Sequence, residues 1–300
     1  MRKTEFIWFD GNFRKMNEVN ISFLTHSLHY GSAVFEGIRF FETEKGSAVF
    51  RLNDHVNRLF YSAQSLNLKI PFSKEDIFDA ICELVRRNKI TSGYIRPIVF
   101  CGEKMGLSIK GAPIHVGIAN WGWDSYLGEK PLKVCVSKFI RIHPNSTIAD
   151  AKISGHYVNS ILASHEAMEK NCDEALLLDF EGNIAEGPGE NIFAVKNGEI
   201  FTPKLGNILP GITRKSVIEI AKQKFNLKVF EQNLSLDFLK TADELFFTGT
   251  AAEISGIGFL EGAKIGTGEI GEVTRKLQDA RKNIISGNDK DYEKWLTFVN

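Results

Sequence analysis

Apolar residues recur at helical spacing in two segments of the first third of the chain. In residues 54–66, and again in residues 73–85, they fall on one face of a helix. The second segment opens with Ser73 and has Asp76 three residues later, which resembles the capping box that closes the first turn of a helix. These patterns predict two amphipathic helices, each with one buried face.

Short segments rich in aromatic and β-branched residues alternate with these helices and predict β-strands. In the first part of the chain, the predicted strands are residues 5–9, 33–41, 94–100 and 114–119. After residue 131, the predicted strands are 132–136, 174–180, 191–195, 227–232 and 244–248, and the predicted helices are 157–169, 212–225, 236–241 and 273–285. Strands and helices are intermixed and no internal repeat is visible, so we predict an α+β fold.

A stretch that bears glycine and aromatic residues, 120–128 (NWGWDSYLG), separates the two groups of elements. Such a stretch is typical of a connection between domains, where ligand sites often form. We predict a small N-terminal α/β domain at residues 1–120, an interdomain loop at 121–131 and a larger domain with a barrel-like sheet at 132–300. The length of 300 residues agrees with two domains.

The charge and hydropathy of the chain exclude some classes of partner. Lysine plus arginine and aspartate plus glutamate both number 37, which gives zero net charge, and no long block of like charges could follow a nucleic-acid backbone. The first residues form no apolar leader, and no uncharged apolar run has membrane-spanning length. We therefore expect a cytoplasmic protein that binds neither nucleic acid nor membrane.

The cysteines and histidines do not indicate a metal site. The four cysteines are Cys82, Cys101, Cys135 and Cys172. They form no Cys-x-x-Cys pair, which argues against a zinc site and against a disulfide framework. His26 and His29 share a possible helical face, but no third ligand accompanies them at metal-site spacing. We expect no bound metal.

Lys152 lies just ahead of the predicted helix at 157–169. A lysine at a helix start feels the positive end of the helix dipole, which favours the neutral amine that attacks carbonyl groups. Most lysines are solvated surface charges, so Lys152 becomes a candidate for catalysis only together with other residues.

Two later segments are suited to hold an anion. Residues 209–214 (LPGITR) run directly into a predicted helix, so the free N–H groups of its first turn point at whatever lies before Gly211. Residues 247–253 (FTGTAAE) end a strand with small and hydroxyl-bearing residues, which allow a ligand to approach closely. A phosphate is the natural guest, although an ordinary helix start would explain the first segment equally well if it stood alone.

Glu186 lies in the turn 185–191 (AEGPGEN), where glycines allow a carboxylate to be held against a flat ligand. Its ordinary role would be to cap the turn or to face solvent. An amine that forms a Schiff base, a phosphate site and an acid that keeps a pyridine nitrogen protonated are together what pyridoxal 5′-phosphate requires. We therefore expect Lys152, Glu186 and the segment around Gly211 to bind this cofactor.

A dinucleotide site is the main alternative from the residues alone. Residues 266–271 (GTGEIG) fit the G-x-G-x-x-G pattern and precede a predicted helix. However, no long buried strand leads into them, and the residues that follow are too few to complete a doubly wound sheet. We interpret the segment as a glycine-rich turn before the last helix.

Taken in order, these segments resemble the fold type IV pyridoxal-phosphate enzymes, and within them the branched-chain-amino-acid aminotransferases. The N-terminal half adds residues 29–39 (HYGSAVFEGIR), 55–59 (HVNRL) and 94–97 (YIRP), and the C-terminal half adds the segments around Lys152, Glu186, Gly211 and Thr250. The resemblance covers nearly the whole chain. It implies a small α/β domain followed by a larger pseudo-barrel domain.

The resemblance implies that Lys152 forms a Schiff base with the cofactor and then acts as the base that moves a proton at the substrate α-carbon. It further implies that Tyr157 binds the ring hydroxyl and that Glu186 binds the ring nitrogen. The residues implied to hold the phosphate are Arg58, Gly211, Ile212, Thr213 and Thr250.

The resemblance also implies an apolar substrate pocket for leucine, isoleucine and valine. Its implied members are Phe35, Arg39, Tyr94, Trp123, Tyr126 and Tyr157, together with Tyr30 and Leu107 of a neighbouring subunit. Arg96, with two of the tyrosines, is implied to bind the second carboxylate of glutamate. Backbone N–H groups of Thr250 and Ala251 are implied to bind the α-carboxylate. A pocket completed by a neighbour implies a homo-oligomer of at least two subunits.

The activity implied is transamination between branched-chain L-amino acids and 2-oxoglutarate. Two departures affect its fine substrate preference: His156 replaces the asparagine usual beside the tyrosine, and Ser255-Gly256 stand where a proline is common. One alternative is a relaxed enzyme of the same fold that also accepts D-amino acids or (R)-amines. Another is a relative that binds the cofactor without catalysis, although the sequence shows the chemical residues in place.

Overall fold

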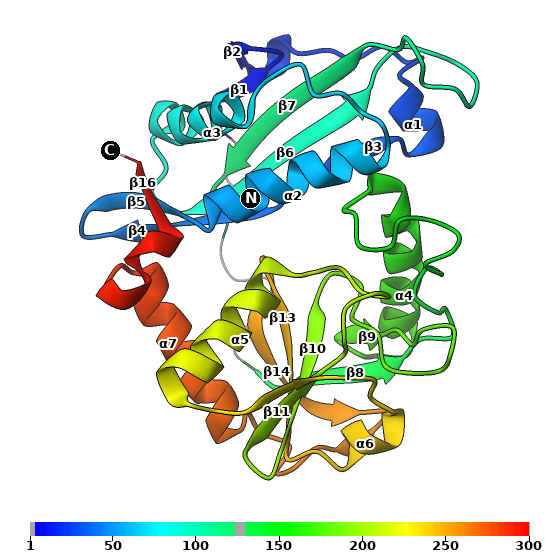
Figure 1. Ribbon diagram of the computed structural model, residues 1–300, viewed down its shortest axis with the longest axis vertical. Helices are drawn as coiled ribbons and strands as arrows, with labels where there is room; N and C mark the ends of the chain where they lie inside the picture. The colour runs from blue at the N-terminus through cyan, green and yellow to red at the C-terminus, as the bar shows by residue number, and fades with distance from the viewer. Residues whose placement is uncertain (1–3, 124–129, 300) are drawn as a thin grey trace. The chain divides into compact units, whose positions relative to one another are not determined.

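The computed structural model describes residues 4–123 and 130–299 (Figure 1). The chain divides into two compact units, each of which is described by itself. The first unit comprises Met1–Asp124, Ala151–His156 and Asn283–Asn300, and the second comprises Ser125–Asp150 and Tyr157–Lys282. The short segment that contains Lys152 and the C-terminal residues thus belong to the first unit, whereas the sequence placed both with the larger domain.

The first unit is built on an antiparallel sheet. Its strand order is β16-β5-β4-β6-β7-β1-β2, and β3 pairs with β6. The strands are β1 (Phe6–Phe9), β2 (Asn12–Lys15), β3 (Ala33–Phe35), β4 (Ile38–Thr43), β5 (Gly46–Phe50), β6 (Gly93–Cys101), β7 (Ile114–Trp121) and β16 (Leu296–Val299). The last strand joins this sheet because residues 296–299 pair with residues 47–50 of β5.

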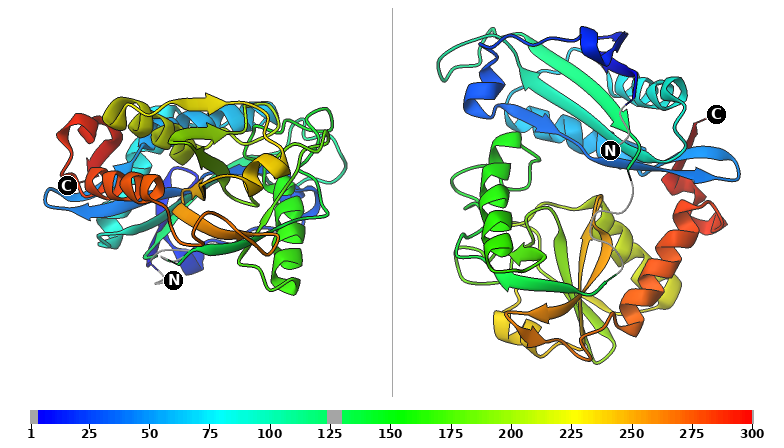
Figure 2. Two further views of the ribbon diagram at one scale, coloured as in Figure 1. Left: turned by 90° about the horizontal axis from the view of Figure 1, so that it is seen from below. Right: turned by 180° about the vertical axis from the view of Figure 1, so that it is seen from behind.

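Two amphipathic helices, α2 (Leu52–Ser65) and α3 (Lys74–Asn88), pack against this sheet (Figure 2). Their apolar faces join the strands in one buried cluster, as their periodicity predicted. The capping box predicted at Ser73 is confirmed. The Ser73 hydroxyl accepts from Asp76 N at 3.0 Å, and the Ser73 N–H donates to the Asp76 carboxylate at 2.8 Å. The remaining helical segments of the unit are η1 (Met16–Glu18), α1 (His26–Tyr30), η2 (Ser154–His156) and η3 (Lys290–Trp295).

The second unit contains a mixed sheet with the strand order β12-β11-β10-β13-β14-β8-β9, to which β15 adds by pairing with β14. The strands are β8 (Leu132–Val136), β9 (Glu174–Leu176), β10 (Asn191–Lys196), β11 (Glu199–Thr202), β12 (Val229–Glu231), β13 (Glu244–Gly249), β14 (Glu253–Leu260) and β15 (Ala263–Lys264). The helices are α4 (Tyr157–Glu169), α5 (Ile212–Phe225), α6 (Leu236–Lys240) and α7 (Glu272–Ile285), whose last three residues are assigned to the first unit.

The predicted strand 33–41 is interrupted at Glu36 and Gly37, which separate β3 from β4. Glycine is required at this break, because a Cβ on Gly37 would lie 1.8 Å from the hydroxyl of Tyr94. The chain turns there and presents Glu36 to the buried side of helix α2. The charged residue Glu36 therefore lies at the break between β3 and β4, where it contacts Arg58 and His55 of α2.

The glycine-rich segment 266–271 forms the turn before α7, as predicted. The first turn of α7 is occupied by the protein's own carboxylate, because Glu244 accepts from Val273 N at 2.9 Å and from Thr274 N at 2.8 Å. A helix start already filled in this way does not offer its N–H groups to a dinucleotide. Among the described residues, no helix is both long and apolar enough to cross a membrane.

Candidate active site

The backbone of Lys152 makes hydrogen bonds through both its carbonyl and its N–H group, within the first unit. Its carbonyl accepts from Phe35 N at 3.2 Å, and its N–H donates to the hydroxyl of Ser62 on α2 at 2.9 Å. Its neighbour Ile153 forms an antiparallel bridge with Val34. The segment therefore lies beside β3 like an added strand, and the 3₁₀ turn η2 separates it from α4. The amine lies 4.8 Å from the centroid of the Phe35 ring.

Arg58, the predicted phosphate ligand of the first unit, forms a two-pronged ion pair with Glu36. Arg58 Nε donates to Glu36 Oε1 at 2.6 Å and Nη2 donates to Oε2 at 2.9 Å. His55 Nδ1 lies 2.7 Å from the same Oε2. Burial alone would raise the pKa of Glu36, but the charge of Arg58 and the hydrogen bonds from both neighbours bring it well below its ordinary value. The carboxylate is therefore ionised.

Aromatic rings and a guanidinium meet at the start of β6. Arg96 stacks over the ring of Phe35 at 4.6 Å, and its Nη2 lies 3.4 Å from the hydroxyl of Tyr94. The rings of Tyr94 and Trp123 meet edge to face, with centroids 4.7 Å apart. Arg96 Nε is buried and has no hydrogen-bond partner in residues 4–123 or 130–299. Four predicted substrate residues thus lie together within the first unit.

The other predicted substrate residues of the first unit are placed differently. Arg39 on β4 is opposite Tyr94 in the sheet and is buried, with its guanidinium over the ring of Phe41. Tyr30 ends helix α1 and Leu107 lies in the loop between β6 and β7, where 87% of its surface is exposed. Tyr126 lies outside the described residues. Tyr157 is the first residue of α4, in the second unit.

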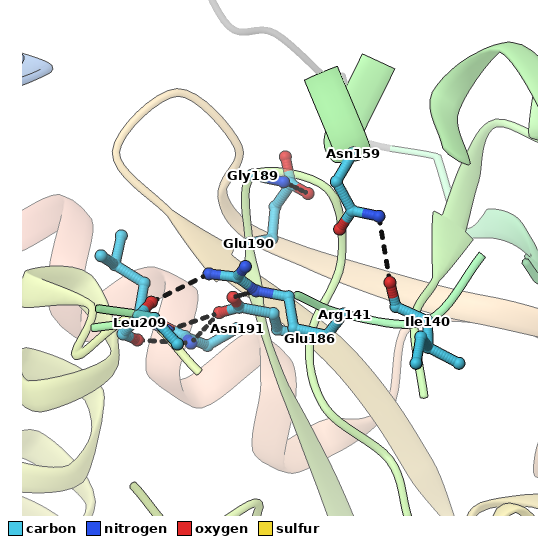
Figure 3. A network of polar contacts seen from close by, with 9 residues as sticks. Ile140, Arg141, Asn159, Glu186, Gly189, Glu190, Asn191 and Leu209 are labelled. Atoms are coloured by element: carbon cyan, nitrogen blue, oxygen red, sulfur yellow. Dashed lines mark hydrogen bonds and ion pairs between the residues drawn. The ribbon is translucent and has the colours of Figure 1, made fainter. Parts of the chain in front are cut away.

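Glu186 is the centre of a buried polar network in the second unit (Figure 3). Arg141 Nε donates to Glu186 Oε1, and Arg141 Nη2 donates to the carbonyl of Ala149 at 3.1 Å. On the other side, Glu186 Oε2 accepts from Asn191 Nδ2 and from Leu209 N, both at 3.1 Å. Arg141, an amide and a backbone N–H therefore fix the position of this carboxylate.

Arg141 and Asn191 are site residues that the sequence did not reveal. Arg141 is 45 positions from Glu186 in the chain, and no local pattern marks such a partner. Asn191 offered a weak signal in the sequence, since it closes the turn that contains Glu186. In the structure, Glu186 and Asn191 form an isolated antiparallel bridge. The structure adds both to the predicted set because they hold Glu186 in place.

The predicted phosphate segment begins helix α5 as expected. Gly211 is the N-cap, so the N-cap residue itself has no side chain to cap the first turn. A Cβ on Gly211 would lie 2.0 Å from Asn191 Oδ1, so only glycine fits between this asparagine and the helix. The N–H groups of the first turn therefore remain suited to an external anion. Ile212 and Thr213 follow and are buried.

The second predicted anion segment lies at the same end of the sheet. Thr248 of β13 is paired with Asn191 of β10, and Thr250 and Ala251 form the turn between β13 and β14. The hydroxyl of Thr248 is buried and finds no hydrogen-bond partner in the described part of the chain. A helix start with glycine at its N-cap, a buried hydroxyl without a partner among the described residues and a fixed carboxylate are the donor and acceptor set that a phosphorylated pyridine would need.

Comparisons with known proteins give the family context of these residues. The model of the family "Amino-transferase class IV" matches residues 33–258. The branched-chain-amino-acid aminotransferase of Pseudomonas aeruginosa is 45% identical over 298 residues, which cover 98% of this chain and 97% of the relative. The enzyme of the same name from Escherichia coli is 38% identical over 307 residues, covering 100% and 99%.

A solved structure is also similar. The crystal structure of the branched-chain amino acid aminotransferase of T.th., complexed with N-(5′-phosphopyridoxyl)-L-glutamate, has a TM-score of 0.96 and 43% sequence identity, and the match covers 100% of both chains. The α+β fold predicted from the sequence is the fold of that structure.

Proposed function

This chain belongs to the class IV aminotransferase family, and from that premise we propose that it transfers the amino group of L-leucine, L-isoleucine or L-valine to 2-oxoglutarate. The products are the branched-chain 2-oxo acids and L-glutamate. The observation that carries the proposal is the buried, anchored carboxylate of Glu186 at the same sheet end as the start of α5. The names of the relatives supply the substrate class.

The proposed cofactor is pyridoxal 5′-phosphate, which supplies an electron-accepting ring that stabilises negative charge at the substrate α-carbon. The chain's own groups have separate roles. Glu186, which accepts a hydrogen bond from Arg141, keeps the ring nitrogen protonated. The first N–H groups of α5, with Thr213, Thr250 and Arg58, bind the phosphate. Tyr157 donates to the ring hydroxyl.

Lys152 is proposed to hold the cofactor and to move the proton at the α-carbon. An amine that shuttles a proton must be aimed while its side chain remains mobile. The contacts of Lys152 support this proposal, because Ser62 and Phe35 fix its backbone and its amine lies over the Phe35 ring. Its backbone is therefore the part that the fold anchors.

The proposed substrate pocket has an apolar and a polar side. The rings of Phe35, Tyr94 and Trp123 offer an apolar wall that suits branched aliphatic side chains. Arg96 can bind the second carboxylate of 2-oxoglutarate, since its Nε is buried without a partner in the described residues. N–H groups at Thr250 and Ala251 are proposed to receive the α-carboxylate.

We further propose that the protein is a homo-oligomer of at least two subunits in the cytoplasm. Each unit exposes large apolar side chains. In the first unit these include Phe23, Leu28, Met105 and Leu107, and on helix α4 of the second they include Val158, Ile161, Leu162 and Met168. Exposed apolar groups of this size favour burial against a second copy. Light scattering after size-exclusion chromatography measures the mass directly.

A substrate panel tests the proposed function. The purified protein is incubated with 2-oxoglutarate and each of L-leucine, D-alanine and (R)-1-phenylethylamine, and L-glutamate is measured. We expect rapid glutamate formation with L-leucine and at least ~10²-fold less with the other donors, because a positioned acid, base and pocket act on one geometry. Comparable rates with the amine would instead support the relaxed enzyme, and no glutamate from any donor would reject the proposal.

A further inference from the structure

Glu36 is a fully buried carboxylate in the first unit. It lies where the chain turns between β3 and β4, and its N–H donates to the carbonyl of Pro97 at 2.9 Å. A buried charge is costly unless hydrogen bonds and an opposite charge compensate it. The side chains that contact Glu36 must therefore supply this compensation.

The Glu36 carboxylate accepts two hydrogen bonds from one edge of the Arg58 guanidinium. Arg58 Nε and Nη2 donate to different oxygens of Glu36, at 2.6 and 2.9 Å, and His55 Nδ1 lies 2.7 Å from the second oxygen. A planar guanidinium held at two points cannot rotate freely. The remaining N–H bonds of Arg58 must point away from Glu36.

The same face of helix α2 also holds the lysine segment. Arg58 and Ser62 are four residues apart, so they are neighbours on the helix surface. Ser62 accepts the backbone N–H of Lys152 at 2.9 Å. The positive charge of Lys152 also contributes, after burial and Arg58, to lowering the pKa of His55. Arg58 and Lys152 are thus anchored to one helix face.

Orientation is the main effect of such a pair, because a buried ion pair contributes little net stability compared with apolar packing. Glu36 remains ionised, since its pKa lies well below its ordinary value, and His55 is neutral, since burial lowers its pKa. The network thus contains one anion and one cation, and the neutral His55 completes the hydrogen bonding. Arg58 is held without a net surplus of negative charge that would repel a phosphate.

We propose that Glu36 is a positioning residue that orients Arg58 towards the phosphate of the cofactor. This inference rests on the proposed function, in which Arg58 is one of the phosphate ligands. Glu36 itself touches neither substrate nor cofactor. It acts through the guanidinium that it holds.

Cofactor affinity of the full-length protein, stripped of cofactor, tests this role. Glu36→Gln keeps the shape of the side chain and removes its charge. We expect pyridoxal 5′-phosphate to bind about 10- to 100-fold more weakly, the effect of disturbing a hydrogen bond to a charged group. Pyridoxal, which lacks the phosphate, should change by less than ~3-fold, because Glu36 is proposed to act on the phosphate alone.

Glu83→Gln is the matched control. Glu83 on α3, like Glu36, accepts hydrogen bonds from arginine, here from Arg86 Nη1 at 3.0 Å and Arg87 Nε at 2.7 Å, but it lies on the surface. Neither affinity should change in this variant. Equal losses for pyridoxal 5′-phosphate and pyridoxal in Glu36→Gln would overturn the proposal, because a purely structural role would affect both ligands.

A second comparison keeps the test valid if Glu36→Gln fails to fold. The double variant Glu36→Gln/Arg58→Met removes both charges together, so it leaves neither of them unpaired. It is compared with Arg58→Met, in which Glu36 has no guanidinium to orient. If Glu36 acts only through Arg58, the two variants bind pyridoxal 5′-phosphate with the same affinity. A further loss in the double variant would contradict the proposal.

Failure of this inference and failure of the proposed function can be told apart. If the wild type forms glutamate from L-leucine while Glu36→Gln keeps full affinity for pyridoxal 5′-phosphate, only the role of Glu36 is rejected. If the wild type binds no pyridoxal 5′-phosphate at all, both are rejected.

Discussion

The side-chain amide of Asn191 lies between the two ends of the proposed cofactor site in the second unit. Its Nδ2 donates to the Glu186 carboxylate at 3.1 Å, while its Oδ1 occupies the space beside the start of α5. The same Nδ2 also donates to the carbonyl of Leu209 at 3.0 Å. One amide therefore fixes both the acid and the helix start.

Replacing this amide should loosen the cofactor. In Asn191→Ala, Glu186 loses one of its donors and the 209–211 segment loses its tether. We expect pyridoxal 5′-phosphate to bind about 10-fold more weakly, as measured by absorbance titration, because a hydrogen bond to a charged group is lost. Asn183→Ala removes a comparable amide, which donates to Asp179 at 3.4 Å, and should leave the affinity unchanged. Equal affinities in both variants would show that Asn191 does not organise the site.

Adding one methyl group at Gly211 should lower the stability of the folded protein. The new Cβ would lie 2.0 Å from Asn191 Oδ1, so the asparagine or the helix must move. We expect Gly211→Ala to lower the free energy of unfolding by about 1–3 kcal/mol, the usual cost of overpacking. Gly117→Ala is the control, since its Cβ would meet neighbours no closer than 3.5 Å. Chemical denaturation of both variants measures the difference, and equal stabilities would refute the steric argument.

Removal of the Lys152 amine should stop turnover while the protein stays folded. Lys152→Ala keeps the backbone contacts to Ser62 and Phe35 but removes the proposed base. We expect kcat to fall by at least ~10²-fold, the lower range for loss of general-base catalysis. Lys133→Ala, on an exposed position of β8, should retain the wild-type rate. Normal turnover by Lys152→Ala would exclude this lysine as the base.

Acid should destabilise the protein partly through His55. Burial first, and then the charges of Arg58 and Lys152, lower the pKa of His55 from its ordinary value of 6.5. The unfolded chain therefore binds a proton at a higher pH than the folded chain, and stability falls as pH drops through 6.5. Glu36, whose pKa is also lowered, adds a further loss below its ordinary value of 4.5.

His55→Asn separates the histidine contribution, since the amide nitrogen can replace Nδ1 as a donor to Glu36. Melting temperatures are compared at about pH 7.5 and about pH 5.5, above and below the ordinary pKa of histidine. We expect the drop between these pH values to be smaller in His55→Asn than in the wild type, because no group with a shifted pKa titrates at this position. An identical drop would mean that His55 does not contribute.

The sequence predicted the parts of the fold that depend on local pattern. Helices α4 and α5 have the predicted bounds, and for α5 the end signals are local, since it begins after Gly211 and ends before Asn226 in the left-handed conformation. It did not predict β2, β5, β11, β14, β15 or β16. The segment of β14 is interrupted by glycines, and β16 is stabilised by pairing with residues 47–50, far earlier in the chain. Neither property leaves a local signal.

The residues of the candidate site also divide into those with a local sequence signal and those without one. Glu186 and Gly211 lie in turns whose glycines mark them in the sequence. Arg141, Ser62 and Glu36 act through contacts with residues far along the chain, so only the folded structure shows their roles. The sequence is therefore most informative about groups proposed to touch the cofactor and least informative about the groups that hold them.

The most direct test of the central claim is the absorbance spectrum of the purified protein before and after addition of L-leucine. We predict a band near ~420 nm from cofactor attached to Lys152, which leucine converts to a band near ~330 nm as the amino group is transferred. Lys152→Ala should lack the first band. A wild-type spectrum that contains the cofactor band but does not respond to leucine would contradict the proposed substrate, and a protein that never acquires the band would contradict the proposed chemistry.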